Sequence, residues 1–295
     1  MTARSHVQVL ENNTNRFLRR ALEAMVQEVT LLRRRDEASR RTIMEYREQM
    51  RSAATIQRDL LPSTLPKVAG LDVHLVFRPA DALSGDLYNV VRIDETHIGI
   101  SLADATGHGL PGGVLATFLC RSLCGGHVRN GSKRSLQPDE VLRRVNRDLL
   151  DAGFTDCPFV TALNAVYHEP TRTLTWARGG APYPILVQHG ELPRQIISQG
   201  PLVGAIEHSE FEVTSLTLQP GAIIVLHTDG LEALLCDRRT EHGRYDLANS
   251  EWFQRLGEQE LVRQIEDLEA RLDSISKSDW YVDDVTVIAL HAREQ

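Results

Sequence analysis

The chain has 295 residues, of which 42% are hydrophobic and 25% are charged, and its formal net charge is −7. This composition is ordinary for a globular protein, and the acidic total disfavours a general nucleic-acid binder, which would present a basic face. No stretch approaches the roughly 20 apolar residues needed to span a bilayer. Because the N-terminal sequence also lacks the apolar segment of a signal peptide, we expect a cytoplasmic protein that binds neither nucleic acid nor a membrane.

The first predicted element is a long helix from about residue 18 to residue 60, a region with neither glycine nor proline. Alternating steps of four and three residues from Leu18 to Leu60 give thirteen positions, of which ten are apolar. A helix with so narrow an apolar seam cannot bury it alone. We expect it to pair with a second copy in a coiled-coil homodimer; the alternative is a helix that packs back onto its own globular domain. Pro62 and Pro66 should end the helix, because proline lacks the amide donor and clashes with the preceding turn.

From about Gly70 onward the pattern changes to short β-branched or alternating runs with helical stretches between them. The predicted strands lie at 73–77, 87–93, 97–103, 159–167, 173–178, 184–188, 211–218, 222–227 and 285–290, and the predicted helices near 111–126, 138–151 and 259–273. Many strands of antiparallel character with helices grouped between them are typical of an α+β layered fold. We predict an α-β-β-α sandwich of antiparallel sheets flanked by helices and preceded by the long N-terminal helix.

Two aspartates are placed symmetrically about a predicted turn. Asp86 opens one strand in SGDLYNV and Asp104 closes the next in LADATGHG, each of them nine residues from Glu95. A simple hairpin therefore puts the two carboxylates side by side at its open end. Like charges directly opposite each other destabilise a pair of strands, and a bound cation would reverse that penalty.

Two further strand ends also present carboxylates. Asp229 follows the apolar run AIIVLH, and Asp283 and Asp284 precede the last strand. Ligation by oxygen alone selects hard cations such as Mg²⁺ or Mn²⁺ and not zinc. A single Asp beside a Gly is more often a turn former, so the prediction depends on the whole set. The glycine-rich segment DATGHGLPGG matches neither the Walker pattern nor GxGxxG, which argues against a nucleotide loop.

In this order and spacing, the motifs resemble those of the SpoIIE/RsbU branch of the bacterial PPM-type (type 2C-like) metal-dependent protein phosphatases. The matching segments are IQRDLLPSTLP, SGDLYNV, DATGHGLPGG, LHTDGLEAL and DDVTVIAL, between about Gln57 and Leu290. The resemblance implies three parts: an N-terminal helical, coiled-coil regulatory segment at 1–55, a linker at 56–69 and a phosphatase domain at 70–295.

The resemblance also implies a metal site with two Mn²⁺ or Mg²⁺ ions. In the family the aspartate at the position of Asp104 bridges the two ions, and the next residue, here Ala105, lends its backbone carbonyl. Asp229 and Asp283 would hold one ion, and Asp86 would hold the other directly or through water. The ions would lower the pKa of a water molecule that attacks the phosphorus in line. Asp104, Asp229 and Asp283 are therefore the predicted catalytic residues.

Three positions bear on how closely the chain follows the family. Asn89 stands three residues after Asp86, where the family usually has a second acid, and we expect it to tune the affinity for one ion. Ala181 replaces a histidine in GGAPYP, which we interpret as variation on the substrate side. His108 could act as a general acid, but a structural role in its loop is favoured, and relatives of the eukaryotic type carry their candidate acid at the position of Thr106.

The implied function is that of a metal-dependent serine/threonine phosphoprotein phosphatase. Its substrate would be phosphoserine or phosphothreonine on a partner regulatory protein, a STAS-type anti-sigma-factor antagonist, with the N-terminal coiled coil relaying a signal. The alternative is a catalytically weak or inactive signalling protein that keeps the phosphatase fold for interaction. The presence of all four aspartates weighs against that alternative.

Overall fold

The computed structural model describes residues 3–107, 109–124, 137–155, 158–236, 247–256, 261–274 and 283–294, with side chains from residue 16 onward. The chain divides into two compact units, Met1–Ser52 and Ala53–Gln295. The first unit belongs to a single helix, and the second contains both sheets and the helices that cover them.

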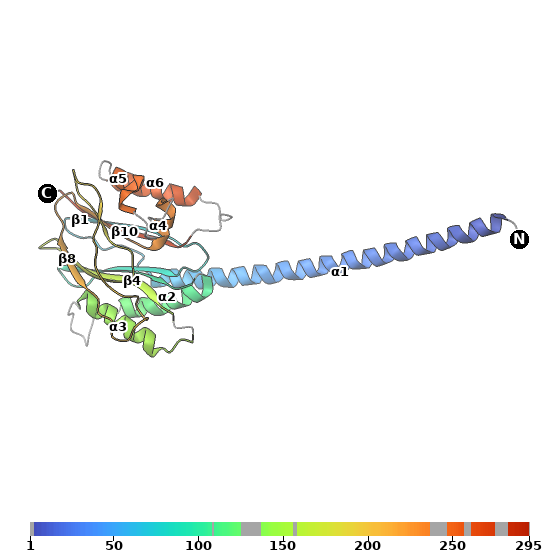
Figure 1. Cartoon of the computed structure of the whole chain (residues 1–295), viewed down its shortest axis with the longest axis horizontal. Helices are drawn as coiled ribbons and strands as arrows, with labels where there is room; N and C mark the ends of the chain where they lie inside the picture. Colours follow the sequence, from blue (N-terminus) through green and yellow to red (C-terminus); the bar gives the residue numbers. More distant parts are fainter. Residues whose placement is uncertain are drawn as a thin grey trace. The chain divides into compact units, whose positions relative to one another are not determined.

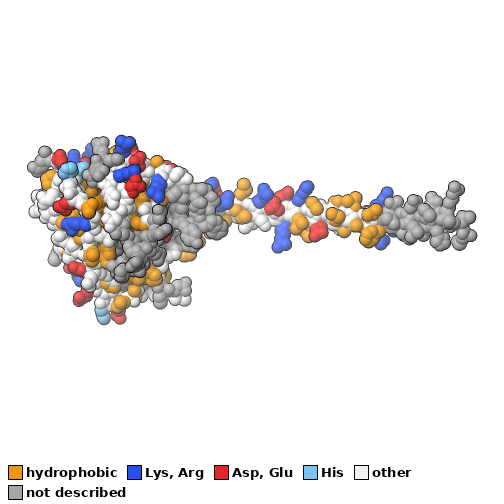
Figure 2. Space-filling model, turned by 45° about the horizontal axis from the view of Figure 1, so that its top comes forward, with side chains coloured by type: hydrophobic (Ala, Val, Ile, Leu, Met, Phe, Trp, Pro, Cys, Tyr) orange, Lys and Arg blue, Asp and Glu red, His pale blue; other side chains and the backbone are white. Residues whose placement is uncertain are grey.

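Helix α1 (Ala3–Leu60) begins well before the predicted start at residue 18, because no glycine or proline interrupts the preceding residues. It ends two residues before Pro62, as predicted. Leu22 and Met25 are among the apolar side chains that are exposed on this helix. Figure 2 shows such apolar side chains between charged ones along the helix. Among the helices that the structure describes, none combines the length and the apolar character that a membrane span requires.

Two antiparallel five-stranded sheets form the centre of the second unit (Figure 1). The first sheet contains, in spatial order, β1 (Leu71–Arg78), β10 (Val285–Ala292), β9 (Ile223–His227), β6 (Ile185–Val187) and β7 (Arg194–Gln195). The second contains β2 (Asp86–Arg92), β3 (His97–Ala105), β4 (Val160–His168), β5 (Thr173–Gly179) and β8 (Val213–Thr217). The last strand, β10, lies between β1 and β9, so the two ends of this unit's chain meet in one sheet.

Helices cover the outer face of each sheet (Figure 1). Helices α2 (Gly109–Cys124) and α3 (Pro138–Asp151) pack on the β2-containing sheet, and α4 (Asp229–Leu235) and α6 (Leu261–Ser274) pack on the β1-containing sheet. The short α5 (Glu251–Leu256) packs against α6 and a 3-10 turn at Leu247–Asn249. This arrangement confirms the predicted α-β-β-α sandwich.

The apolar core lies between the sheets and beneath each helical layer. Residues that alternate along β3, such as Ile100 and Leu102, are fully buried together with Ile288 of β10. Phe77 of β1 meets Tyr88 of β2 edge-to-face, with ring centroids 5.3 Å apart. Because side chains alternate between the faces of a strand, this contact shows which side chains of β2 point into the sandwich.

All nine predicted strands are present, and the predicted helix at 138–151 coincides with α3. The sequence patterns did not indicate β7, α4 or α5, which are two to seven residues long. Elements this short carry too few residues to establish a period, so only their tertiary contacts define them.

Candidate metal-binding active site

The hairpin of β2 and β3 brings the first two predicted site residues together. Asp86 is paired directly with Asp104 in the register of the two strands, as the symmetric spacing predicted. Both side chains lie on the face that points into the sandwich, because Asp86 has the same parity as Tyr88. Two carboxyl groups therefore face the space between the sheets at the open end of the hairpin.

Asp86 is held deep in this space by hydroxyl groups from the opposite sheet. Its Oδ2 atom accepts hydrogen bonds from the hydroxyls of Thr228 (2.7 Å) and Thr286 (2.6 Å), and the residue is only 2% exposed. Burial and the negative charge of Asp104 raise the pKa of Asp86 well above its ordinary value, against the opposing effect of the two hydroxyls. The orientation of this carboxyl group is therefore fixed by the contact between the sheets.

Asp104 lies closer to the surface and is half-buried. Burial and the negative charges of Asp229, Asp283 and Asp284 raise the pKa of Asp104 to about 8. Among the residues that the structure describes, the charges that raise this pKa are those of neighbouring carboxylates. A cation bound beside Asp104 would supply the opposite charge and stabilise the ionised form.

Asp229 is the first residue of α4, directly after strand β9 and Thr228. Gly230 follows it at a point where a Cβ atom would lie only 2.1 Å from the backbone oxygen of Asp284, so no larger residue fits there. Partial desolvation and the negative charge of Asp283 raise the pKa of Asp229. The side chain itself is exposed, on the surface side of the cluster.

The neighbouring residues Asp283 and Asp284 have different environments. Asp284 is buried, and its two carboxylate oxygens accept hydrogen bonds from the backbone amides of Ala80 and Gly85, both at 2.7 Å. Asp283 is exposed, and one of its oxygens accepts the amide hydrogen of Asp284 (2.9 Å). Asp284 therefore braces the loop before β2, and Asp283 is the member of the pair with a carboxylate at the surface.

Backbone carbonyls complete the oxygen-rich surroundings. A Cβ atom at Gly85 would lie 3.0 Å from the carbonyl oxygen of Ala105 and 3.1 Å from that of Gly107. The two carbonyls therefore crowd the backbone just before Asp86, where a side chain would have to displace them. The predicted carbonyl donor, Ala105, is thus beside both members of the facing pair.

The donor set suits hard divalent cations, because it consists of carboxylate and carbonyl oxygens whose mutual repulsion a cation would relieve. Across the ranges that the structure describes, however, no three carboxylate, imidazole or thiolate groups converge to the spacing of one ion's ligands. The fit to a cation is therefore one of chemistry and charge.

Four supporting residues were given no role from the sequence, although Asp284 was named there together with Asp283. Thr228, Thr286 and Asp284 act as described above; the fourth is Gln57, in the last turn of α1. Its side-chain amide donates to the carbonyl of Ser84 (2.7 Å), and its side-chain oxygen accepts from the amide of Ser84 (3.0 Å). A polar residue on the apolar seam of a helix was the available signal for Gln57, and hydroxyl residues flanking Asp229 and Asp283 were the signal for the threonines.

The positions that depart from the family do not face the acidic cluster. Asn89 is three residues after Asp86, so its side chain points to the opposite face of the sheet, toward the helices, and it is buried there. The expectation that it tunes an ion is wrong for this reason. Ala181 is buried in the main core, so its replacement of histidine is not variation on a substrate-facing surface. His108 lies outside the described residues, and Thr106 exchanges hydrogen bonds with the backbone of Phe159.

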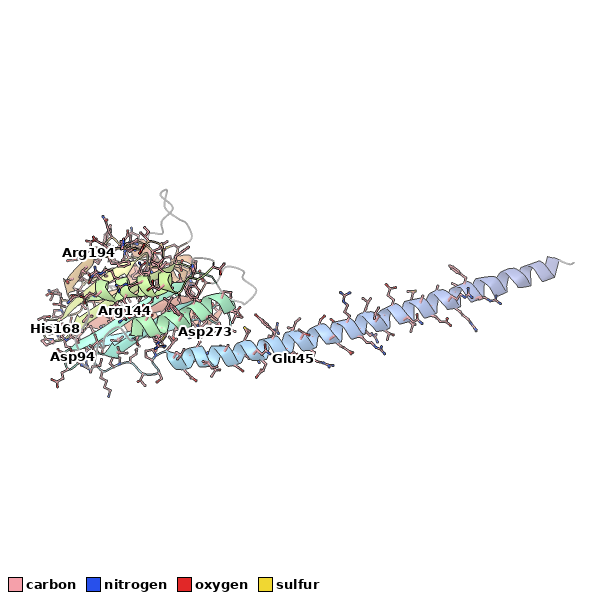
Figure 3. All side chains as sticks on the ribbon, turned by 90° about the horizontal axis from the view of Figure 1, so that it is seen from below. Glu45, Asp94, Arg144, His168, Arg194 and Asp273 are labelled. Atoms are coloured by element: carbon pink, nitrogen blue, oxygen red, sulfur yellow. The ribbon has the colours of Figure 1, made fainter. Side chains whose placement is uncertain are left out.

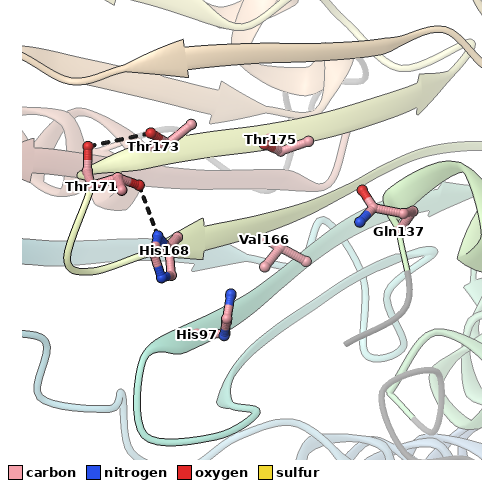
Figure 4. A pocket seen from close by; sticks show the side chains of 7 residues that line it. All are labelled: His97, Gln137, Val166, His168, Thr171, Thr173 and Thr175. Carbon is pink, nitrogen blue, oxygen red and sulfur yellow. Dashed lines mark hydrogen bonds between the residues drawn. The ribbon is translucent and has the colours of Figure 1, made fainter. Parts of the chain in front are cut away.

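A separate pocket of about 290 Å³ lies at the other end of the same sheet (Figure 4). His97 and His168, paired across β3 and β4, stack there with ring centroids 4.7 Å apart. Asp94 accepts a hydrogen bond from Nδ1 of His97 (2.9 Å), and Thr171 bonds to Nδ1 of His168 (2.8 Å). Since β3 runs from His97 to Ala105, this pocket is separated from the acidic cluster by the length of that strand.

Comparisons with solved structures define the class of the fold. The SiaA-PP2C domain of Pseudomonas aeruginosa has a TM-score of 0.67 to this chain at 20% identity, covering 85% of this chain and 98% of that one. RsbX, solved in complex with magnesium, has a TM-score of 0.55 at 13% identity and covers 77% of this chain and 98% of its own. The fold is therefore that of PP2C-type phosphatase domains.

Sequence comparison identifies the family within this class. The SpoIIE model (stage II sporulation protein E) matches residues 94–293, and the chain belongs to this family. Phosphoserine phosphatase RsbU of Bacillus subtilis is 27% identical over 253 residues, which is 84% of this chain and 71% of RsbU. Phosphoserine phosphatase RsbP of the same organism is 25% identical over 192 residues, or 64% of this chain, and the match spans only 46% of RsbP. The chain is accordingly placed among the protein serine/threonine phosphatases.

Proposed function

We propose that this chain hydrolyses phosphoserine or phosphothreonine on a partner regulatory protein, a STAS-type anti-sigma-factor antagonist, and that two Mn²⁺ or Mg²⁺ ions serve as cofactors. The observation that supports this proposal best is the pair Asp86 and Asp104, which face each other in the register of β2 and β3 and whose pKa values are raised by burial and by neighbouring carboxylates. When bound, divalent cations supply an activated water nucleophile and neutralise charge on the phosphoryl oxygens.

The acidic residues would have different roles in metal binding, according to how deeply each side chain is buried. Asp86 is the innermost carboxyl, held in one orientation by two threonine hydroxyls. Asp104 would bridge the two ions, with the carbonyl of Ala105 as a further donor, and the exposed Asp229 and Asp283 would hold one ion from the surface side. Asp284 would keep the loop before β2 in place through its hydrogen bonds to backbone amides.

We propose in addition that 1–55 is a regulatory segment that forms a homodimeric coiled coil, joined by the linker 56–69 to a phosphatase domain at 70–295. The exposed apolar side chains along α1, including Leu18, Val29 and Ile43, support this division. Deleting residues 1–50 should lower the mass measured by light scattering to that of a monomer and alter the activity. If the number of chains per particle, calculated from the measured mass, is the same with and without residues 1–50, the coiled-coil dimer is eliminated.

The catalytic proposal is tested by following hydrolysis of p-nitrophenyl phosphate and of a serine-phosphorylated STAS protein from the same genome. After chelation, activity should vanish and return on addition of Mn²⁺ or Mg²⁺, and the Asp104→Asn variant should remain at the background. If the wild type with metal is no more active than Asp104→Asn on either substrate, the chain is instead an inactive interaction protein with the phosphatase fold.

A further inference from the structure

Helix α2 presents an apolar stripe on the face that points away from the sheet. Leu110 and Val114 are exposed, and Phe118 is half-buried; successive members are four residues apart and therefore share one face. The sheet-facing side of the helix is packed tightly, since Ala116 and Leu119 are buried in the core. Phe118 also packs against this core, so Leu110 and Val114 are the members of the stripe that are exposed.

The apolar surface continues onto neighbouring elements. The ring of Phe154, just after α3, meets that of Phe118 edge-to-face with centroids 5.6 Å apart, and Phe154 is itself exposed. Phe159, before β4, and Ile206, which is 58% exposed, extend the same kind of surface. The name apolar rim is used below for Leu110, Val114, Phe118, Phe154, Phe159 and Ile206.

Hydrogen bonds connect the apolar rim to the acidic cluster. Thr106, two residues after Asp104, donates its amide hydrogen to the carbonyl of Phe159 (3.3 Å) and accepts from the amide of Phe159 at its hydroxyl (3.1 Å). On α3, the buried Asn146 donates to the carbonyl of Ile206 (2.8 Å) and accepts from the amide of Gly204 (2.7 Å). Phe159 is therefore tied to the end of the strand that carries Asp104, and Ile206 is tied to helix α3.

We propose that the apolar rim is the docking surface for the folded phosphoprotein substrate, which would present its phosphorylated residue beside an exposed apolar patch of its own. This inference rests on the proposed function. A protein that brings a phosphoryl group to Asp104 would also lie over Phe159, which is hydrogen-bonded to Thr106 two residues after Asp104. Exposed apolar clusters mark surfaces that bind other proteins, and aromatic anchors carry much of the binding energy there. A small aryl phosphate reaches the carboxylates without touching the rim.

The test compares two matched substitutions, Val114→Glu in the rim and Val262→Glu on α6. Both valines are exposed on helices, by 58% and 48%, and α6 covers the other sheet. With the serine-phosphorylated STAS protein as substrate, Val114→Glu should lower kcat/KM by roughly tenfold or more through KM, whereas Val262→Glu should change it less than about twofold. Hydrolysis of p-nitrophenyl phosphate should stay at the wild-type rate in both variants.

A second variant and a binding measurement guard against indirect effects. Ile206→Glu should reproduce the effect of Val114→Glu, and calorimetry in the Asp104→Asn background should show the same weakening of binding to the STAS phosphoprotein. Three results for the rim variants would each overturn the docking proposal. The first is unchanged kinetics with the phosphoprotein, the second is an equal loss of activity on both substrates, and the third is a loss of self-association in place of substrate binding. A wild type that hydrolyses p-nitrophenyl phosphate yet ignores the STAS phosphoprotein would also overturn the docking proposal. A wild type inactive on both substrates would overturn the proposed function as well.

Discussion

The two ends of the β2–β3 hairpin use the same residue type in opposite ways. At the open end, Asp86 and Asp104 face each other and their pKa values are raised. At the turn, Asp94 accepts hydrogen bonds from the amides of Thr96 and His97 and from the ring of His97. Slight desolvation raises the pKa of Asp94, but these hydrogen bonds outweigh it and bring the pKa to about 2. Asp94 and His168 mark this end in Figure 3.

The role of a carboxylate in this hairpin is therefore indicated by the hydrogen-bond donors around it and not by its position beside a glycine or a turn. Asp94 has donors for its negative charge within its own turn, so it serves the structure. Asp104 has mostly other carboxyl groups around it, an arrangement that costs stability unless something positive binds. Strained electrostatics of this kind are typical of functional sites.

The largest expected effect is on catalysis. Asp104→Asn should reduce metal-dependent hydrolysis of p-nitrophenyl phosphate by on the order of 10²–10³-fold or more, because the substitution removes a charge that would face the cations. Asp94→Asn, a matched change at the other end of the hairpin, should leave the rate within about twofold. Equal losses in the two variants would show that the ends of the hairpin do not differ in function.

The next effect separates the adjacent residues Asp283 and Asp284 by stability. Asp284→Ala should lower the free energy of unfolding by roughly 2–4 kcal/mol, because two backbone amides lose their acceptor. Asp283→Ala should change it by less than about 0.5 kcal/mol, since the side chain is exposed. Urea denaturation of both variants measures the difference, and a larger cost for Asp283→Ala would contradict the assigned roles.

The acidic cluster should also make the metal-free protein less stable at higher pH. The pKa of Asp104 is raised to about 8 from 3.8, so the folded state holds a proton that the unfolded state has released between those values. Stability from this proton is fully present below pH 3.8 and is lost as the pH rises toward 8.

Thermal melts of chelated protein should therefore show a falling Tm from pH 6 to pH 8, by roughly 2–4 °C for each kcal/mol lost. Added Mn²⁺ should raise Tm more at pH 8 than at pH 6. In the Asp104→Asn variant, both the Tm of the chelated protein and the increase in Tm caused by Mn²⁺ should vary less with pH. A wild-type Tm that does not change with pH would show that protein groups compensate the charge of the carboxylates.

The smallest expected effect lies at the turn. Asp94→Ala should cost about 1 kcal/mol of stability through the lost hydrogen bonds to Thr96 and His97. Because the pKa of Asp94 is lowered to about 2, its contribution is present above about pH 4 and disappears as the pH falls toward 2. Denaturation at pH 6 and pH 2.5 should show the difference between wild type and variant shrinking at the lower pH.

Much of the fold follows from local patterns. Alternation and apolar runs predict the nine strands, and the spacing about Glu95 predicts that Asp86 lies opposite Asp104, as the register of β2 and β3 shows. The expected role of Asn89 was wrong, because matching a motif by position ignores which face of a strand a residue occupies. Ala181 lies between β5 and β6, and its place in the core follows only from tertiary packing. Alternation from Asp86 would have turned Asn89 away from the site.

The long N-terminal helix, the layered sandwich and the set of four carboxylates can be predicted from the amino-acid sequence, because these features depend on periodicity and on residue type at strand ends. The differences among the carboxylates arise from tertiary contacts. Asp86 is buried because β9 and β10 of the other sheet bring Thr228 and Thr286 over it, and Asp284 turns inward because the loop before β2 offers it two amides. Such contacts join residues about 140 to 200 positions apart, and no local pattern encodes them.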